Sequence, residues 1–221
     1  MRIGLFGGTF NPIHYGHLRA SLEVKEEFGL DKIYLIPSAI PPHKSPRGVV
    51  DAKDRFHMIQ LAISDQSDFI VSDVELDRPG PSYSIDTVHH FQKILPKDPR
   101  FYLILGTDAF YEIDTWKAYK DFFDLVPMII MLRPGDRFSM APKRHSYFET
   151  FLKTKISEKY SYSEDLSCFI HPEKQSIFIA YITSLDISST HIRDLIGRGK
   201  SIRYLVPDSV ADYIVTKGLY L

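Results

Sequence analysis

Apolar and polar positions follow one another along this chain in a pattern that predicts strands and helices in turn. Residues 2–6 and 31–37 are short runs rich in β-branched, aromatic and other apolar side chains, which are typical of buried strands. Between them, residues 17–29 carry apolar side chains at helical intervals and stop at a glycine. The beginning of the chain therefore predicts a strand, a crossover helix and a second strand.

The same alternation continues to the end of the chain. It predicts strands at 68–76, 100–106, 126–132 and 176–182, and helices at 52–63, 84–95, 188–200 and 207–219. The last helix should be capped at Asp208 and end at Gly218. Two segments rich in proline and basic residues, 37–50 and 133–142, are predicted as surface loops near a site, and 143–172 as helical and then irregular. Such alternation predicts an α/β fold: a single doubly wound, mainly parallel sheet with C-terminal helices.

Composition narrows the class of protein. A chain of 221 residues can bury one sizeable core, so we expect one domain over residues 1–221. With 25% charged residues and a net charge of −1, there is no excess of cations for a nucleic-acid partner. No apolar run reaches the length of a signal peptide or a membrane span. The single cysteine, Cys168, excludes an internal disulfide and fits the cytoplasm. The oligomeric state stays open, and a homo-oligomer fits as well as a monomer.

The most informative stretch is GGTFNPIHYGHL, residues 7–18, directly after the first predicted strand. Ligands bind beyond the carboxyl ends of the strands in an open parallel sheet, and glycines there let the backbone approach a ligand closely. His14 and His17 would share one face of the first turn of the following helix, where free N–H groups and the helix dipole favour an anion. The pair is therefore suited to a phosphate site, in which the imidazoles would donate hydrogen bonds to phosphate oxygens and offset charge. Whether both imidazoles or only His17 would contact the reacting phosphate is left open. A helix cap with a packing histidine is an alternative, and so is a zinc pair, although a third ligand is not apparent.

Several motifs together resemble those of the H-x-G-H nucleotidyltransferase superfamily, in particular bacterial nicotinate-nucleotide adenylyltransferases. The matching blocks occur in that family's order and span nearly the whole chain: GTFNPIHYGH at 8–17, PPHK at 41–44, RPGPSYSIDT at 78–87, GTDAFYEIDTW at 106–116, LRPG at 132–135 and ISSTHIR at 187–193. The chain departs from the commoner family pattern at Asn11, Ser84 and Ile113, where Asp, Thr and Leu are more frequent. Of these, the change at Ser84 bears on fine specificity.

The resemblance implies adenylyl transfer from ATP to nicotinate mononucleotide, with Mg²⁺ bound to ATP and no metal site built by protein residues. His14, His17 and Arg193 would be catalytic, with His17 nearest the transition state and Arg193 on the leaving pyrophosphate. Family residues that contact ATP correspond here to Gly7, Gly8, Thr9, Phe10, His17, Gly106, Asp108, Ser188, Ser189, Thr190 and Arg193.

For the mononucleotide, the resemblance implies a second set of residues. Trp116 would stack on the pyridine ring, and backbone N–H groups around Tyr83 and Ser84 would meet its carboxylate. Lys44 and Arg133 would face its phosphate. Taken without the resemblance, Lys44 is an ordinary surface lysine and Trp116 fits the core equally well.

Three other functions compete with this one. A pantetheine-phosphate adenylyltransferase and a cytidylyltransferase belong to the same superfamily, but the Trp116 block and SYSIDT at 82–87 argue against both. A regulatory protein that binds a nucleotide without turnover is the third, and retention of His14, His17 and Arg193 argues against it. The preference for nicotinate over nicotinamide mononucleotide is left open.

Overall fold

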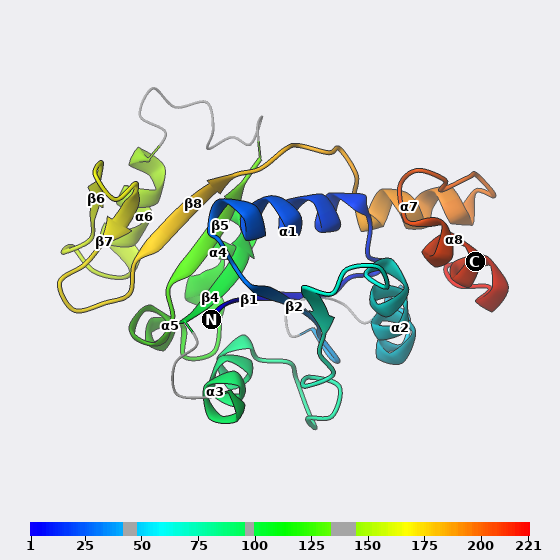
Figure 1. Ribbon diagram of the computed structural model, residues 1–221, viewed down its shortest axis with the longest axis horizontal. Helices are drawn as coiled ribbons and strands as arrows, with labels where there is room; N and C mark the ends of the chain where they lie inside the picture. Colours follow the sequence, from blue (N-terminus) through cyan, green and yellow to red (C-terminus); the bar gives the residue numbers. More distant parts are fainter. Residues whose placement is uncertain (42–47, 96–99, 134–144) are drawn as a thin grey trace.

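The computed structural model describes residues 1–41, 48–95, 100–133 and 145–221 (Figure 1). Its strands are β1 (Arg2–Gly8), β2 (Lys32–Pro37), β3 (Phe69–Val71), β4 (Arg100–Gly106), β5 (Met128–Leu132), β6 (Ser161–Ser163), β7 (Cys168–Ile170) and β8 (Ile177–Tyr181). Its helices are α1 (Tyr15–Glu27), α2 (Ala52–Ala62), α3 (Ser84–Ile94), α4 (Thr107–Tyr111), α5 (Tyr119–Leu125), α6 (Ser146–Lys155), α7 (Ser189–Gly197) and α8 (Asp208–Lys217), with a 3₁₀ turn η1 (Ile113–Thr115).

The strands form one sheet in the order β3-β2-β1-β4-β5-β8-β7-β6. Neighbours from β3 to β8 are parallel, and the pairs β8-β7 and β7-β6 are antiparallel. The predicted single, doubly wound, mainly parallel sheet is confirmed. The order of the strands reverses between β1 and β4, which places the carboxyl ends of these two strands side by side.

Helices cover both faces of the sheet because the side chains of its strands alternate between two cores. In β4, Ile104 belongs to the core formed with α1, α2, α7 and α8, whereas Leu103 and Leu105 belong to the core formed with α3, α4, α5 and α6. Figure 1 shows α1 and α3 on opposite sides of the strands. A parallel strand buried on both faces reads as a continuous apolar run, which is why β4, β5 and β8 could be predicted from the sequence.

Some predictions of local structure were wrong. The strand predicted at 68–76 ends at Val71, because the chain turns at Asp73, whose carbonyl accepts hydrogen bonds from the N–H groups of Leu76 and Asp77. Helix α8 begins at Asp208 itself, with Pro207 at the capping position, while its end at Gly218 is confirmed by a left-handed φ of 63°.

The segment 143–172 also differs in part from its prediction. Helix α6 confirms the helical half of it. The second half contains β6 and β7, which pair as an antiparallel hairpin at the edge of the sheet and had been predicted as irregular. Most of the loop predicted at 133–142 and part of the one at 37–50 lie outside the described residues.

Candidate active site

Two adjacent cavities lie at the carboxyl ends of β1 and β4. Gly7, Gly8, Thr9, Gly106 and Ala109 line both of them. This is the point at which the strand order reverses, where doubly wound sheets bind their ligands. We name the larger one the histidine cavity, because His14 and His17 line it, and the smaller one the tryptophan cavity, because Trp116 lines it.

The histidine cavity has a volume of about 560 Å³. A Cβ added at Gly7 or Gly106 would meet no described atom within 4 Å outside the neighbouring residues, so a side chain there would extend into open space. The glycines therefore leave room for a ligand rather than for packing. All the residues predicted to contact ATP line this one cavity: Gly7, Gly8, Thr9, Phe10, His17, Gly106, Asp108, Ser188, Ser189, Thr190 and Arg193.

The two histidines of the first loop are stacked on each other. Their ring centroids are 3.7 Å apart and their planes are inclined by 24°. His14 occupies the capping position of α1 and His17 its first turn, as their spacing predicts. Between them, a Cβ at Gly16 would lie 3.0 Å from Nδ1 and 3.1 Å from Cε1 of His14. A glycine at this position therefore lets the His14 ring lie against the helix backbone.

The environment of His14 makes it an uncharged group at neutral pH. Its side chain is buried, and this burial together with the positive charge of Arg133 lowers the pKa of His14 to about 4. Its Nδ1 atom is buried and has no hydrogen-bond partner in the part of the chain that the structure describes. A neutral imidazole can still donate one hydrogen bond. In this structure His14 is therefore an uncharged hydrogen-bond donor, and Arg133 and Arg193 line the same cavity.

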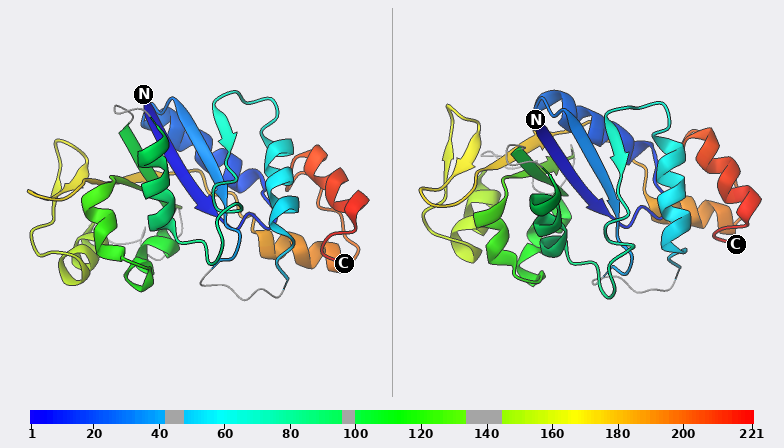
Figure 2. Two further views of the ribbon diagram at one scale, coloured as in Figure 1. Left: turned by 90° about the horizontal axis from the view of Figure 1, so that it is seen from below. Right: turned by 60° about the horizontal axis from the view of Figure 1, so that its bottom comes forward.

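The start of α7 is hydrogen-bonded to the loop that follows β1. The hydroxyl of Ser189 donates to the Pro12 carbonyl at 2.8 Å, and Nη1 of Arg193 donates to the Asn11 carbonyl at 2.8 Å. Ser188 caps the helix by accepting the N–H group three residues further on. Figure 2 shows α7 in orange beside the segment after the dark-blue strand β1. The two segments predicted to bind anions therefore form one unit, in which Ser189 and Arg193 also hold the loop.

The side chain of Asn11 bonds the loop after β1 to the segment before α2 and to the C-terminal residues. Its side-chain oxygen Oδ1 accepts hydrogen bonds from the Tyr220 hydroxyl at 2.9 Å and from the Val50 N–H group at 3.2 Å, and its side-chain nitrogen Nδ2 donates to the Gly48 carbonyl at 2.8 Å. The carboxylate of an aspartate could accept but not donate here. The structure thus gives the asparagine at this position a use of its own.

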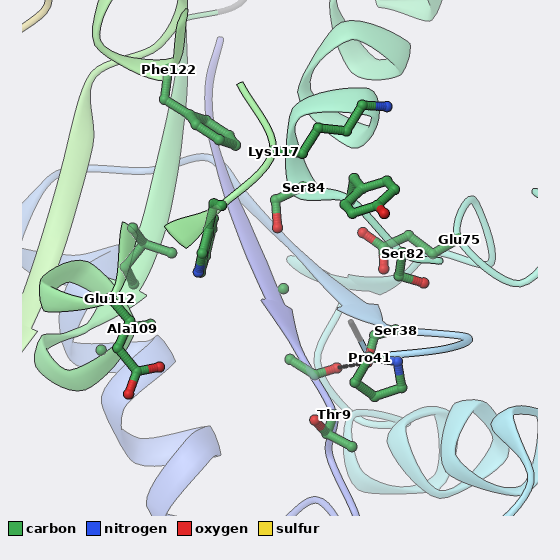
Figure 3. Close-up of a pocket in the computed structure, with 16 residues that line it drawn as sticks. Thr9, Ser38, Pro41, Glu75, Ser82, Ser84, Ala109, Glu112, Lys117 and Phe122 are labelled. Atoms are coloured by element: carbon green, nitrogen blue, oxygen red, sulfur yellow. Dashed lines mark hydrogen bonds between the residues drawn. The ribbon is translucent and has the colours of Figure 1, made fainter. Parts of the chain in front are cut away.

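The tryptophan cavity has a volume of about 230 Å³ and brings together Trp116, Tyr83 and Ser84. Trp116 is half-buried and packs edge-on against Phe122, with ring centroids 5.9 Å apart. It therefore both contributes to the core and lines the cavity. In Figure 3, Ser84, Ser82 and Glu75 lie on one wall, and Ala109 and Glu112 on the opposite one.

Lys44 and Arg133 are the two residues predicted to face the phosphate of the mononucleotide. Lys44 lies outside the described residues. Arg133 is exposed at the end of β5 and lines the histidine cavity, not the tryptophan cavity. Since the phosphate of the mononucleotide must meet that of ATP, this position is compatible with the predicted role.

Sequence reasoning missed a buried arginine behind the site. The side chain of Arg55 in α2 is 1% exposed, and its guanidinium donates to the carbonyls of Thr9 at 2.8 Å, Val50 at 3.0 Å and Ala39 at 3.3 Å. Burial lowers the pKa of this guanidinium. Arg55 lies one turn before two buried apolar residues, Met58 and Ile59, on the same face of α2. That spacing is the signal by which it could have been found.

Sequence reasoning also missed several polar residues of the tryptophan cavity. They come from the loop after β2, the segment between β3 and α3, and the segment between α4 and α5: Ser38, Glu75, Ser82, Glu112 and Lys117. Glu75 had been placed in a strand, so that its turn towards the cavity was not foreseen.

Neither a metal cluster nor a membrane span is found in the described ranges. No three His, Cys, Asp or Glu side chains gather there as metal ligands, and none of the helices combines the length and hydropathy needed to cross a membrane.

Comparison with known proteins identifies the family. The family model described as "Cytidylyltransferase-like" matches residues 5–195. A protein of Desulfatibacillum aliphaticivorans named "Probable nicotinate-nucleotide adenylyltransferase" is 42% identical over 225 residues, which cover all of both chains. The chain belongs to the nicotinate-nucleotide adenylyltransferase family. Another member of this family, from Syntrophotalea carbinolica and named in the same words, is 41% identical over all of this chain and 97% of its own.

A solved structure supports the fold of this family member. The nicotinic acid mononucleotide adenylyltransferase of Plasmodium falciparum, in complex with NaAD, superposes with a TM-score of 0.73. The alignment covers 99% of this chain and 97% of that one, at 19% identity. At this identity the likeness concerns the fold, which agrees with the one described above.

Proposed function

We propose that this protein is a nicotinate-nucleotide adenylyltransferase, which joins ATP and nicotinate mononucleotide to form deamido-NAD and pyrophosphate in NAD biosynthesis. The observation that carries the proposal is that the two cavities share lining residues at the carboxyl ends of β1 and β4. One cavity offers cations and imidazoles suited to phosphates, the other an indole suited to a flat ring, and they meet at Gly7, Gly8, Thr9 and Gly106. The relatives at about 40% identity over the whole chain carry the same activity in their names.

The chemistry requires no nucleophile from the protein. A phosphate oxygen of the mononucleotide forms a bond to the α-phosphorus of ATP. The bond from that phosphorus to the oxygen bridging to the β-phosphate breaks, and pyrophosphate leaves with the electron pair. Because the attacking oxygen is already an anion, a general base is not needed. Catalysis comes from alignment of the reactants and from stabilisation of the charge that develops.

The residues of the histidine cavity divide this task. We infer that His17 donates to the α-phosphate, where negative charge develops in the transition state. His14 donates a hydrogen bond as a neutral imidazole, because its pKa of about 4 leaves it uncharged before the phosphates arrive. Arg193 and the hydroxyls at the start of α7 bind the departing pyrophosphate, and Arg133 neutralises the phosphates beside His14.

Magnesium fits this site as a companion of ATP. Asp108 is the one carboxylate among the described residues that line the histidine cavity, which suits a cation held chiefly by phosphate oxygens and water. When bound, the ion would supply neutralisation of the phosphate charge. The protein residues around it position the phosphates.

Nicotinamide mononucleotide has nearly the same shape as the nicotinate form, so a side activity with it is expected. The cytoplasm remains the predicted location, and a homo-oligomer remains as compatible with the chain as a monomer.

The decisive experiment is a turnover assay with ATP, Mg²⁺ and nicotinate mononucleotide that follows pyrophosphate release. We expect release with this pair, slower release with nicotinamide mononucleotide, and none with 4′-phosphopantetheine. Substitution of CTP for ATP should abolish or sharply reduce the rate. Binding of ATP without pyrophosphate release for either pyridine mononucleotide would instead favour the regulatory binding protein.

A further inference from the structure

A buried carboxylate lies in the wall of the tryptophan cavity and takes no part in the mechanism above. The side chain of Glu75 is 5% exposed and lines this cavity. Its Oε1 atom accepts a hydrogen bond from the hydroxyl of Thr87 at 2.6 Å, and the hydroxyl of Ser82 is hydrogen-bonded to the same carboxylate. Two hydroxyl groups from the segment around the start of α3 therefore converge on one acceptor.

The contacts of Ser82 extend this arrangement to the loop after β2. The oxygen of its hydroxyl accepts from the N–H group of Ala39 at 2.8 Å, and its own N–H group donates to the carbonyl of Ile40 at 3.0 Å. Glu75 thus fixes a serine that pairs with the backbone of a second loop. Both loops border the tryptophan cavity, through Ser82 and Pro41.

The contacts of Thr87 extend it into the first turn of α3. Nη2 of Arg78 donates to the Thr87 hydroxyl at 3.1 Å and to the carbonyl of Tyr83 at 3.4 Å, and lies 4.0 Å from Oε1 of Glu75. Tyr83, the capping residue of α3, and Ser84, its first residue, line the cavity. Figure 3 shows Ser84 on the wall opposite Glu112. The position of Ser84 and Tyr83 in this wall therefore depends on the carboxylate of Glu75.

A carboxylate at position 75 can accept the hydrogen bonds of both hydroxyls, but burying its negative charge costs free energy. An ionised carboxylate accepts hydrogen bonds with both oxygens and donates none, so that both hydroxyls can point towards it. A glutamine would offer only one oxygen. Burial raises the pKa of Glu75, which reflects the cost of an ionised group here. Lys117, which also lines the cavity, forms its ion pair with Asp86, with Nζ 3.0 Å from Oδ2. Among the ion pairs of the described residues, the cation beside Glu75 is therefore Arg78.

We propose that Glu75 is a positioning residue of the mononucleotide subsite, which holds the first turn of α3 at a fixed place in the cavity that Trp116 lines. It thereby sets the affinity for the pyridine ring and the preference for its acid over its amide form. The inference rests on the proposed function, since it takes the tryptophan cavity as the pyridine subsite. An acid and an amide differ little in shape, so a wall displaced by a few tenths of an ångström lowers discrimination before it lowers turnover.

The test compares Glu75→Gln with the wild type in the pyrophosphate assay. We expect the KM for nicotinate mononucleotide to rise roughly tenfold, because the displaced turn of α3 would make weaker contacts with the pyridine ring. The KM for ATP and kcat should change by less than about twofold, and the ratio of kcat/KM for the nicotinate over the nicotinamide form should fall. Unchanged KM and ratio, or a loss confined to kcat, would overturn the proposal.

A second pair of variants covers the case in which Glu75→Gln does not fold. Thr87→Val removes the hydroxyl that Glu75 accepts and should reproduce the rise in KM, whereas Thr87→Ser should recover most of the affinity. Equal effects of the two replacements would contradict the inference.

The matched control is Glu23→Gln. Glu23 likewise accepts from a threonine, with Thr183 Oγ1 and N each 2.6 Å from its carboxylate, but it lines neither cavity. We expect it to lower thermal stability without raising the KM. If it raised the KM as much as Glu75→Gln, the effect would be general destabilisation. If the wild type itself released no pyrophosphate with nicotinate mononucleotide, the proposed function would fail, which is a different result from a wild type and a Glu75→Gln variant with equal KM.

Discussion

The imidazole rings of His14 and His17 are stacked with their centroids 3.7 Å apart, and both line the same cavity as the residues at the start of α7. Two protonated imidazoles at this separation would repel each other. The pKa of about 4 for His14 removes this conflict at neutral pH, since His14 is then uncharged. The pair thus places an uncharged donor, His14, directly against a second imidazole, His17.

If His17 stabilises the transition state, its removal should lower the rate and not the binding. We expect His17→Ala to reduce kcat by roughly 10²- to 10³-fold, the scale of one lost donor to a developing oxyanion. The dissociation constant for ATP, measured by calorimetry, should change only modestly. A variant with nearly the kcat of the wild type would contradict the role.

Gly16 offers a way to displace His14 without removing it. In Gly16→Ala, the new Cβ would lie 3.0 Å from Nδ1 of His14, so the ring must shift. We expect kcat to fall roughly tenfold or more, because catalysis is sensitive to small misplacement, while the helix itself gains from alanine. The control is Gly197→Ala at the end of α7, where a Cβ meets no described atom within 4 Å. Equal kcat for the two variants would show that the His14 ring tolerates the displacement.

The lowered pKa of His14 makes stability depend on pH in a defined window. In the unfolded chain the imidazole takes up a proton near pH 6.5, but in the folded protein only near pH 4. Between these values the unfolded state binds more protons, so the free energy of unfolding falls as the pH falls. The whole shift corresponds to about 3 kcal/mol. Urea denaturation at pH 7 and pH 4.5 should show a smaller loss for His14→Asn than for the wild type, and an equal loss would contradict the assignment.

Most of the sheet could be predicted because its signals are local. The strands β1, β2, β4, β5 and β8 lie within the parallel sheet, and each reads as a short, nearly continuous apolar run in the sequence alone. The hairpin of β6 and β7 could not be predicted in this way. Its strands have three residues each, too few for a periodic signal, and β7 is fixed by pairing with β8. Likewise α4, η1 and α5 are short elements that follow from packing against the sheet.

The candidate site likewise contains residues that local motifs predict and contacts between distant segments that they do not. The blocks around His17 and Ser189 could be found from their motifs, but not the hydrogen bond that joins Ser189 to Pro12 across 177 positions of the sequence. Arg55 and Glu75 were missed for a related reason. Arg55 bonds to the backbone of Thr9, Ala39 and Val50, and Glu75 to the hydroxyls of Ser82 and Thr87, and no short motif records such contacts.

Arg55 should matter for stability more than its distance from the phosphates suggests. Its guanidinium donates to three backbone carbonyls: that of Thr9 after β1, and those of Ala39 and Val50 in the segment between β2 and α2. Arg55→Met would leave these carbonyls without their donor, and we expect a loss of about 3 kcal/mol in the free energy of unfolding. Arg55→Lys should lose less, because it retains the charge and some donor capacity. Urea denaturation measures both, and a loss below about 1 kcal/mol for Arg55→Met would contradict the inference.

Trp116 can report directly on which substrate enters its cavity, because it is the single tryptophan of the chain. Stacking of a pyridine ring on the exposed part of its indole should quench its fluorescence, so nicotinate mononucleotide should reduce the emission and ATP alone should leave it nearly unchanged.

In the turnover assay, Trp116→Ala should raise the KM for the mononucleotide roughly tenfold or more, and Trp116→Phe should raise it less, since part of the aromatic face remains. Because Trp116 also packs against Phe122, thermal unfolding must show that both variants are folded at the assay temperature. Equal quenching by ATP, or an unchanged KM in a folded Trp116→Ala variant, would place the pyridine ring elsewhere and leave the indole with packing alone.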